Sequence, residues 1–301
     1  MKRKTLISII GPTAIGKTSL SIILAKHFNA EIISCDSRQF YKEMCIGTAV
    51  PSQEELSEVQ HHFIQHKSIV EDYNVGRFEQ DALKLIEQLF KTHDVLLLTG
   101  GSGLYQKAVL EGLDDFPDVD SSIRKQLNES LEEDGLEHLK SQLKRLDPEY
   151  YKTADIDNPH RVIRALEICI GTEKPFSSYL NKTKENRDFN SVKIGLTAER
   201  HVIYDRINRR VDLMLDEGLL EEAKQLYPHK HLNALKTVGY TELFDYLDGE
   251  ITLEKAIDDI KKNTRRYAKR QLTWYRKQDD INWFEYSEKP ETILRFLEAH
   301  V

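Results

Sequence analysis

Four residues near the N-terminus have the types and the spacing that bind phosphate groups. Gly11, Gly16, Lys17 and Thr18 complete the pattern G-x-x-x-x-G-K-[ST]. In such a loop the backbone N–H groups converge on phosphate oxygens, the lysine adds a full positive charge, and the hydroxyl binds a metal or a phosphate oxygen. The pattern therefore predicts a bound nucleotide or some other pyrophosphate.

A carboxylate that would hold the water shell of Mg²⁺ is missing from its usual place in an ATPase, the end of a second apolar strand. The candidate strand at 95–98 ends in Thr99, Gly100 and Gly101, and no Asp follows before Asp114. This weakens the ATPase interpretation without excluding it. The glycines permit close approach of the backbone to a ligand, although a plain turn explains them nearly as well.

Asp36 stands where a carboxylate can do chemistry. It follows a β-rich apolar stretch at 31–35, and ligands bind at the carboxyl ends of the strands in open α/β sheets. A carboxylate at that edge can hold a metal or accept a proton. The sequence DSRQ is equally typical of a helix cap, so the residues alone leave both roles open. Ser37, Arg38 and Gln39 could present donors to a polar substrate.

Two pairs of arginines have helical spacing. Arg161 and Arg164 are three residues apart, and Arg206 and Arg210 are four apart, so each pair shares one helix face. A guanidinium of the second pair could reach a pyrophosphate with two parallel hydrogen bonds. A solvated helix edge and surface salt bridges are the alternatives for both pairs.

Residues 261–277 form a basic stretch without any acidic residue, interleaved with Tyr267, Trp274 and Tyr275. The chain has a net charge of −7, so any contact with nucleic acid requires a local basic patch. This stretch is the candidate surface for an RNA backbone, with a solvated helix face as the alternative. Its basic residues are Lys261, Lys262, Arg265, Arg266, Lys269, Arg270, Arg276 and Lys277.

The elements that must position these residues follow a strand–helix–strand pattern. Strands are expected at 5–10 and 31–35, with a helix at 17–28 between them, which is typical of a parallel α/β sheet. Apolar residues at helical spacing predict an amphipathic helix over 76–92. A buried strand is expected to follow over 94–101.

The pattern changes after residue 113. The next stretch reads as several helices joined by turns that contain Pro and Asp, until a strand at 192–198 restores the α/β pattern and helices fill the rest. We therefore predict an α/β fold with a P-loop NTPase-like parallel sheet core. This core is formed by residues 1–113 and 191–301, and a mostly helical insertion domain, 114–190, splits it.

Composition limits the class of protein. Hydrophobic residues make up 40% and charged residues 31% of 301 residues, as in an ordinary globular chain. No run approaches the ~18 apolar residues of a membrane span. The apolar run at the N-terminus leads directly into the phosphate loop, unlike a signal peptide. The three cysteines contain no C-x-x-C pair, which indicates a reducing, cytoplasmic location and no zinc site.

Taken in order, these segments resemble the tRNA dimethylallyltransferases, isopentenyl transferases that modify the adenosine beside the anticodon. The resemblance runs from about residue 6 to 284. It rests on GPTAIGKT, DSRQFYKEMCIGTA, HHF with VGRFEQDA, TGGSGLY, NPHRVIRALEI, RVDLMLDEGLLEEA, KTVGYTEL and KNTRRYAKRQLTWYR. It implies transfer of a dimethylallyl group from dimethylallyl diphosphate to N6 of adenosine 37 in tRNA, giving N6-isopentenyladenosine, and a P-loop core with a helical insertion.

The resemblance also implies roles for individual residues. Asp36 matches the family's general base, and Arg210 matches a residue that contacts the pyrophosphate. Thr18 is expected to be a third catalytic residue and the candidate ligand of a Mg²⁺ cofactor. The pyrophosphate-binding residues are Gly11, Pro12, Thr13, Ala14, Ile15, Gly16, Lys17 and Thr18.

The tRNA anticodon stem-loop and dimethylallyl diphosphate are the expected partners, without a membrane, and we expect a monomer. The residues expected to contact tRNA are Asp36, Ser37, Arg38, Gln39, His160, Arg161, Val162, Ile163, Arg164, Lys236, Thr237, Val238, Gly239, Tyr240 and Thr241, with Ser102 and Arg124 as weaker candidates.

Three alternatives remain open from the sequence. An adenylate isopentenyltransferase that acts on free AMP, ADP or ATP would share the phosphate loop and Asp36. A P-loop small-molecule kinase would hold ATP in the loop, and an RNA-binding module would have lost its activity. Eukaryotic relatives often carry a C-terminal zinc finger, and the chain ends at 301 without one, which indicates the bacterial type. Ile15 departs from the small residue of many relatives without evident functional meaning.

Overall fold

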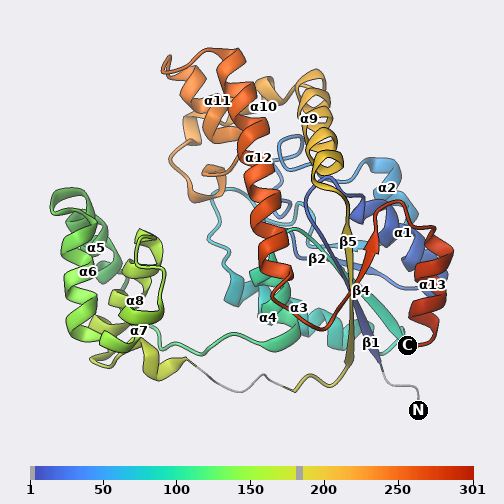
Figure 1. The fold of residues 1–301 in the computed structure, drawn as a ribbon, viewed down its shortest axis with the longest axis horizontal. Helices are drawn as coiled ribbons and strands as arrows, with labels where there is room; N and C mark the ends of the chain where they lie inside the picture. The colour runs from blue at the N-terminus through green and yellow to red at the C-terminus, as the bar shows by residue number, and fades with distance from the viewer. Residues whose placement is uncertain (1–3, 181–185) are drawn as a thin grey trace. The chain divides into compact units, whose positions relative to one another are not determined.

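The computed structural model describes residues 4–180 and 186–301. The chain divides into two compact units, which we call the core unit (Met1–Glu111 with Asn186–Val301) and the helical unit (Gly112–Glu185) (Figure 1). The division expected from the sequence placed the insertion at 114–190, and its standing as a separate domain stays a prediction. None of the described helices is long and apolar enough to cross a membrane.

The core unit is built on one parallel sheet of six strands, in the order β3-β2-β4-β1-β5-β6. This confirms the predicted α/β class with a P-loop-like parallel sheet. The expected strands at 5–10 and 31–35 are β1 and β2, and those at 94–101 and 192–198 are β4 and β5. The strands are β1 Thr5–Ile10, β2 Ile32–Ser34, β3 His61–His62, β4 Val95–Thr99, β5 Asn190–Thr197 and β6 Ile281–Glu285.

One sequence expectation is wrong: helices do not fill the whole chain after β5. Residues 281–285 form the edge strand β6, which pairs in parallel with β5 from Lys193–Ile281 onward. Trp283 packs on Gly195, where an added Cβ would lie 2.5 Å from the indole ring. The segment INWFE is short and half polar, so pairing with a distant strand decides its conformation.

Apolar side chains on both faces of the sheet explain why its strands read as continuous apolar runs. In β1, Ile7 and Ile9 join a core cluster with Leu24 of the helix after the phosphate loop. The intervening Leu6 belongs to the opposite cluster, together with Phe78. Alternate residues therefore anchor β1 from two sides, and its carboxyl end is held rigidly at the start of the phosphate loop.

Helices cover this sheet, and Figure 1 shows α9, α10, α11 and α12 grouped on one side of the core unit. The predicted helix at 17–28 is confirmed as α1, and the one at 76–92 is α3, which ends earlier. The helices are α1 Lys17–Phe28, α2 Gln53–Glu58, α3 Val75–Leu89, α4 Gly103–Glu111, α9 Arg200–Asp216, α10 Leu219–Leu226, α11 Tyr240–Leu247, α12 Leu253–Tyr275 and α13 Pro290–Glu298.

The helical unit contains no strand among its described residues, as the sequence predicts. Its core is formed by Leu139, Leu143 and Leu166, all fully buried. The Asn158 side chain accepts the N–H of His160 and so caps the longest of its helices. The helices are α5 Ser121–Glu133, α6 Gly135–Leu146, α7 Pro148–Thr153 and α8 Pro159–Thr172, followed by the short helix η1 Phe176–Tyr179.

Candidate functional site

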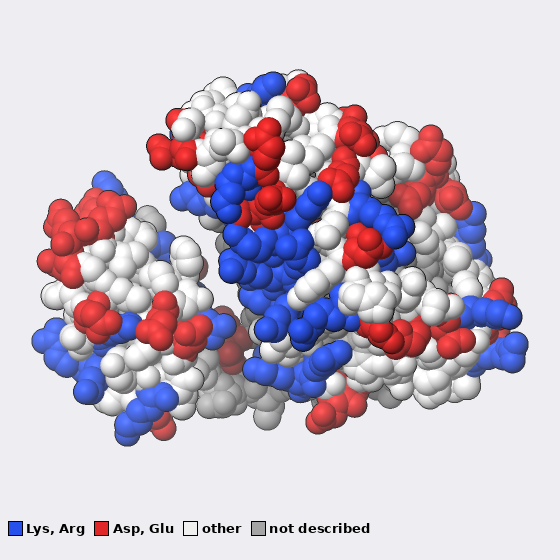
Figure 2. Space-filling view, turned by 45° about the horizontal axis from the view of Figure 1, so that its top comes forward, with Lys and Arg blue, Asp and Glu red and all other residues white. Residues whose placement is uncertain are grey.

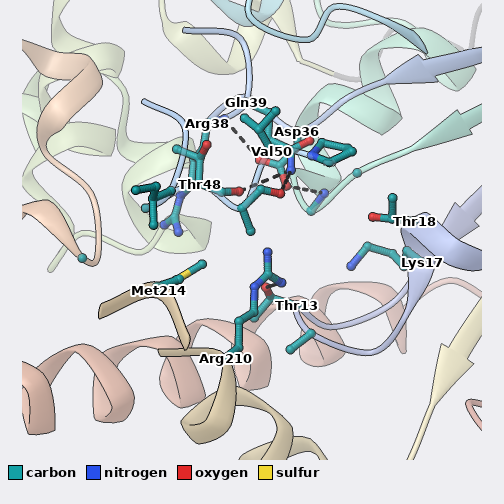
Figure 3. Close-up of a pocket in the computed structure, with 18 of the residues that line it drawn as sticks. Thr13, Lys17, Thr18, Asp36, Arg38, Gln39, Thr48, Val50, Arg210 and Met214 are labelled. Carbon is teal, nitrogen blue, oxygen red and sulfur yellow. Dashed lines mark hydrogen bonds between the residues drawn. The ribbon is translucent and has the colours of Figure 1, made fainter. Parts of the chain in front are cut away.

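A cavity of about 880 Å³ lies within the core unit, and the sequence-predicted chemistry gathers on its walls. The phosphate loop, the loops that follow β2 and β4, and side chains of α9 and α12 line it. Figure 3 shows the side chains of Lys17, Arg210 and Asp36 around the same open space. The carboxyl ends of the parallel strands therefore form the site, as expected for an open α/β sheet.

The phosphate loop owes its shape to two glycines. Gly11 has φ +146° and Gly16 has φ +106°, conformations that side chains strongly disfavour. An added Cβ at Gly11 would also lie 2.7 Å from the Leu196 carbonyl oxygen. Gly16 is the N-cap of α1, so the first backbone N–H groups of this helix face the cavity region. This arrangement suits an anion, because the helix N-terminus carries partial positive charge.

Lys17 supplies the positive charge of this loop. Its Nζ donates to the carbonyl oxygens of Gly11 (3.1 Å) and Pro12 (2.9 Å), so the cation folds back over the loop. Burial lowers the pKa of Lys17 to about 8, although the nearby Asp36 carboxylate opposes this and the Arg210 guanidinium adds to it. An anionic ligand would favour the charged form and offset the burial.

The two arginines of α9 have different roles. Arg206 lines the cavity and donates through Nε to the Ala14 carbonyl oxygen (2.7 Å), so it supports the phosphate loop. Arg210 reaches the cavity, and its Nη1 lies 3.4 Å from Thr13 Oγ1. Burial lowers the pKa of Arg210, while the Asp36 charge raises it. Both arginines line the cavity, but the Arg206 side chain is engaged by the loop backbone, which leaves Arg210 as the candidate contact for a bound anion together with Lys17.

Asp36 does not cap a helix, because a turn and not a helix follows it. Its Oδ1 accepts the N–H of Arg38 (3.1 Å), and its Oδ2 accepts the N–H of Gly101 (3.2 Å). These bonds orient the carboxylate at the cavity wall. The role as a helix cap, which the sequence left open, is therefore excluded, because the side chain binds its own turn and the second glycine loop.

The second glycine loop packs directly on Asp36. An added Cβ at Gly100 would lie 2.6 Å from the Asp36 nitrogen, and one at Gly101 would lie 2.9 Å from Asp36 Oδ2. Both glycines are therefore needed for close approach of two loops, rather than for a turn alone. The Ser102 Oγ also contacts Ser37 Oγ (2.9 Å) and accepts the Ser37 N–H (3.2 Å), so it holds the same two loops together.

Glu222 of α10 is a supporting residue that sequence reasoning missed. Its carboxylate accepts the N–H groups of Cys45, Ile46 and Gly47 at 2.9, 2.8 and 2.9 Å, and the hydroxyl of Tyr240 at 2.7 Å. These bonds fix the start of the 45–50 loop, which lines the cavity. No local pattern could reveal this role, since Glu222 and the loop are far apart in sequence.

The Lys236–Thr241 segment borders the cavity through Val238 and Gly239. Lys236 and Thr241 are exposed beside it. Tyr240 is fully buried and its hydroxyl is bonded to Glu222, and its contact with tRNA stays a prediction.

The predicted tRNA-binding residues of the helical unit differ in exposure. His160 and Arg161 are exposed at the first turn of α8, whereas Val162 and Ile163 are only 1% and 4% exposed, and the tRNA contacts of all four stay predictions. The apolar side chains of Val162 and Ile163 belong to the core of this unit, which is why they lie inward.

Arg124 and Arg164 meet at one buried carboxylate of the helical unit. Arg124 donates to both oxygens of Glu167, at 3.0 and 2.7 Å, and Arg164 Nη1 donates to Glu167 Oε2 at 2.8 Å. Glu167 has a lowered pKa: burial opposes this shift, but the bonds to the two arginines outweigh it. The structure thus joins two predicted tRNA-binding residues, although one carboxylate offsets part of their charge.

The basic stretch 261–277 lies on α12 and just beyond it. Lys262 pairs with Asp259 of the same helix, and the other basic residues divide into two groups. Figure 2 shows Lys and Arg side chains gathered on this face of the core unit. Lys261 pairs with Asp212 (2.5 Å), and Arg265 donates to Asn208 (2.6 Å), so both support the packing of α12 on α9. The exposed basic residues are Arg266, Lys269, Arg270, Arg276 and Lys277, and Trp274 is exposed among them.

Comparisons with known proteins agree on one family. The family model described as IPP transferase matches residues 39–278. A protein of Christiangramia forsetii named tRNA dimethylallyltransferase is 62% identical over 98% of both chains. One of Flavobacterium johnsoniae with the same name is 56% identical over 98% of this chain and 97% of its own.

Solved structures point the same way. The crystal structure of the tRNA isopentenylpyrophosphate transferase of Bacillus halodurans is 40% identical, with a TM-score of 0.73 over 99% of this chain and 96% of its own. A eukaryotic dimethylallyltransferase described as acting on tRNA is 29% identical, with a TM-score of 0.78 over 95% of this chain and 74% of its own.

Proposed function

The chain belongs to the IPP transferase family, and we propose that it transfers a dimethylallyl group from dimethylallyl diphosphate to N6 of adenosine 37 in tRNA. The relatives' names support tRNA as the acceptor. The observation that carries the proposal is one cavity lined by a phosphate loop, a half-buried arginine and a strand-end carboxylate. These groups can stabilise an anionic leaving group and accept a proton.

The reaction needs two kinds of help. The lone pair on N6 of adenine is delocalised into the ring, so the nitrogen is a poor nucleophile. It forms a bond to C1 of the dimethylallyl group, while the bond from C1 to the diphosphate oxygen breaks and its electron pair leaves with the diphosphate. Positive charge that develops on the allylic carbon spreads over the double bond. The enzyme must therefore stabilise the departing diphosphate and take one proton from N6.

We assign the stabilisation of the leaving group to the phosphate loop and its neighbours. Lys17, Arg210 and the backbone N–H groups at the start of α1 present positive charge from different sides of the cavity (Figure 3). Bonds to Gly11 and Pro12 hold the Lys17 side chain in place before the reaction, and a bond to Thr13 holds that of Arg210. Preorganised charge of this kind stabilises a developing anion with little reorganisation.

Thr18 is the residue proposed to hold Mg²⁺. No group of three or more His, Cys, Asp or Glu within 4–180 and 186–301 is placed to bind a metal alone. The Thr18 side chain lies at the cavity wall, and diphosphate and water would complete the coordination of the ion. A bound Mg²⁺ would supply charge neutralisation for the leaving group.

Asp36 is proposed as the general base. Its carboxylate already accepts two backbone N–H groups, and a carboxylate has lone pairs for a further donor. The N6 proton would pass to this carboxylate as the new C–N bond forms. Arg38 and Gln39 line the same wall, and the Arg38 guanidinium stacks on the Tyr267 ring at 4.4 Å. This places donors around the proposed position of the base.

The reactive adenosine has to leave its stack to reach the cavity. The exposed basic residues of α12 and the exposed part of the Lys236–Thr241 segment support an RNA-binding surface of the core unit. In the helical unit the proposed contacts with accessible side chains are His160, Arg161 and Arg164, together with Arg124. A tRNA substrate also supports the expected cytoplasmic location, and we keep the monomer as part of the proposal.

The alternatives are weaker on chemical grounds. A kinase would need a carboxylate for the water shell of Mg²⁺ at the end of β4, and this strand ends at Thr99 before Gly100 and Gly101. An enzyme for free AMP would not need the exposed basic face of α12. A module without activity would not need Lys17, Thr18 and Asp36 around one cavity.

The test is a prenyl-transfer assay with labelled dimethylallyl diphosphate and Mg²⁺. Unmodified tRNA, AMP and ATP are offered in parallel reactions. Label on the adenosine beside the anticodon, and none on free nucleotides, is the expected result. Label on AMP or ATP alone would assign the chain to the free-nucleotide reaction. Absence of transfer to any acceptor, with hydrolysis of ATP, would overturn the proposal in favour of the kinase.

A further inference from the structure

Gln271 of α12 links the two halves of the site with both ends of its amide. Its Oε1 accepts the N–H of Thr13 in the phosphate loop at 2.9 Å. Its Nε2 donates to the carbonyl oxygen of Gly101 in the second glycine loop at 2.8 Å. The side chain is only 5% exposed. A buried amide with one donor and one acceptor used on two separate loops acts as a spacer of fixed length between them.

The partners of Gln271 also fix its orientation. A flipped amide would place its NH₂ against the Thr13 N–H and its oxygen against the Gly101 oxygen, which is unfavourable at both ends. Tyr267, one turn earlier on α12, donates its hydroxyl to the same Gly101 oxygen at 3.1 Å. Burial raises the pKa of Tyr267 to about 12, and the Asp36 charge adds to this, so the hydroxyl keeps its proton at neutral pH.

Gly101 carries the effect of Gln271 to the catalytic carboxylate. Its N–H donates to Asp36 Oδ2 at 3.2 Å, while its carbonyl oxygen accepts from α12. An added Cβ at Gly101 would lie 2.9 Å from both Asp36 Oδ2 and Gln271 Nε2. The glycine is therefore enclosed between the two side chains and has no room to shift toward either one.

We propose that Gln271 is a positioning residue that fixes the Asp36 carboxylate relative to the phosphate loop, and this rests on the proposed function. On the other side of Gln271, Thr13 contacts Arg210 through its side chain. The buried amide of Gln271 thus connects the group that accepts the proton with the groups that bind the diphosphate. Because reactivity depends on near-attack geometry, loss of this spacer lowers kcat more than it lowers substrate binding.

The first test replaces Gln271 by Met, which has a similar length and cannot serve both loops. We expect kcat for tRNA to fall about 30- to 100-fold. The KM for dimethylallyl diphosphate and the dissociation constant for tRNA change less than about threefold, because Lys17, Arg210 and the basic face remain. Gln106→Met is the matched control, since Gln106 is 2% exposed and its amide bonds Ser8 outside the cavity.

The second test uses Gln271→Glu and a pH profile. When the introduced carboxyl group is ionised, one oxygen still accepts the Thr13 N–H. The other oxygen then lies against the Gly101 carbonyl oxygen, and the two repel each other. When the carboxyl group is protonated, it can donate to that carbonyl and so restores the original pattern. We therefore expect the ratio of variant to wild-type kcat to rise as the pH falls. Loss of folding would instead lower kcat of Gln271→Met and Gln271→Glu at every pH.

The outcomes separate this inference from the proposed function. Wild-type protein that transfers no label to tRNA would overturn the function itself. Active wild-type protein with a Gln271→Met variant of equal kcat would overturn the positioning role alone. A folded Gln271→Met variant with reduced kcat, a Gln106→Met control with normal kcat, and a Gln271→Glu ratio that rises at low pH would support it. A flat ratio would contradict it.

Discussion

The two halves of the cavity are built in different ways. The diphosphate half consists mainly of one continuous segment, residues 11–18, whose glycines and helix start shape a binding loop. The acceptor half is assembled from Asp36, Gly101 and Gln271, which come from three separate elements. A local motif can bind a leaving group, but the placement of a base relative to it depends on contacts between distant segments.

The largest expected effect tests the acceptor half. Replacement of Asp36 by Ala removes the proposed base, and we expect kcat to fall by about 10²- to 10⁴-fold. The dissociation constant for tRNA should stay within about threefold, because the basic face of α12 is unchanged. Single-turnover transfer and filter binding measure the two quantities. Turnover near that of the wild type would remove Asp36 as the base.

The matching change in the diphosphate half is Arg210→Gln. We expect a loss of about 10²- to 10³-fold in kcat/KM for dimethylallyl diphosphate, since a charge that faces the leaving group is lost. Unlike Asp36→Ala, this variant should also bind inorganic diphosphate more weakly, as calorimetry can show. Arg206→Gln is the comparison variant, because it removes a guanidinium that lines the same cavity but bonds the Ala14 carbonyl oxygen. Equal diphosphate binding by wild type and Arg210→Gln would contradict the assignment.

The contact between the halves can be stressed directly at Gly101. An added methyl group would press on both Asp36 and Gln271, so Gly101→Ala should lower kcat by about tenfold. Gly76→Ala is the matched control, because the nearest atom to its new Cβ is Asn74 Oδ1 at 3.5 Å, an ordinary contact. Steady-state kinetics with both variants provide the measurement. The same kcat in Gly101→Ala and wild type would show that the loops are not tightly coupled.

The diphosphate half should also respond to pH through Lys17. The pKa of this lysine is about 8 in the free protein, and a bound anion favours its charged form. Above pH 8 binding of dimethylallyl diphosphate must therefore take up a proton, and affinity should fall by up to about tenfold per pH unit. Calorimetry from pH 7 to 9.5 measures this, and Lys17→Met should flatten the wild-type curve. A wild-type curve that is already flat would contradict the expectation.

The same shift predicts the direction of a stability change. The folded pKa of Lys17 lies below its unfolded value of 10.5, so the unfolded chain binds more protons between about pH 8 and 10.5. The contribution of Lys17 to the free energy of unfolding therefore rises with pH in this window. Denaturant unfolding of wild type and Lys17→Met, compared across this range, isolates the effect. A difference between the two that stays constant with pH would contradict it.

The smallest expected effect concerns the exposed basic face. Lys269→Ala together with Arg270→Ala should weaken tRNA binding several-fold and reduce the slope of log affinity against log salt by roughly 1 to 2. The matched control is Lys84→Ala together with Lys91→Ala, which changes the net charge by the same amount at exposed sites on and beside α3. Binding measured over a range of salt concentrations distinguishes the pairs. Equal slopes for the two double variants would show that the basic face of α12 is a solvated surface that does not bind tRNA.

Sequence patterns predicted the parts of this protein that depend on near neighbours. Apolar periodicity predicted β1, α1, β2, α3 and β4 in their order, although it missed the short elements α2 and β3. Gly11, Gly16, Lys17 and Thr18 define their loop by spacing alone. Asp36 could be placed at the functional edge, because the carboxyl ends of parallel strands meet there. The edge strand β6 was missed, since its pairing with β5 outweighs a weak local preference.

What only the tertiary structure decided is which side chains face the cavity and what holds them there. Thr13 and Gln271 are 258 positions apart in the chain, and Cys45 and Glu222 are 177 apart, so no local pattern could connect either pair. Helix rotation turns Val162 inward beside the exposed Arg161. Backbone preferences and strand polarity are determined locally by the sequence, whereas the partners of a buried polar group depend on how distant segments pack.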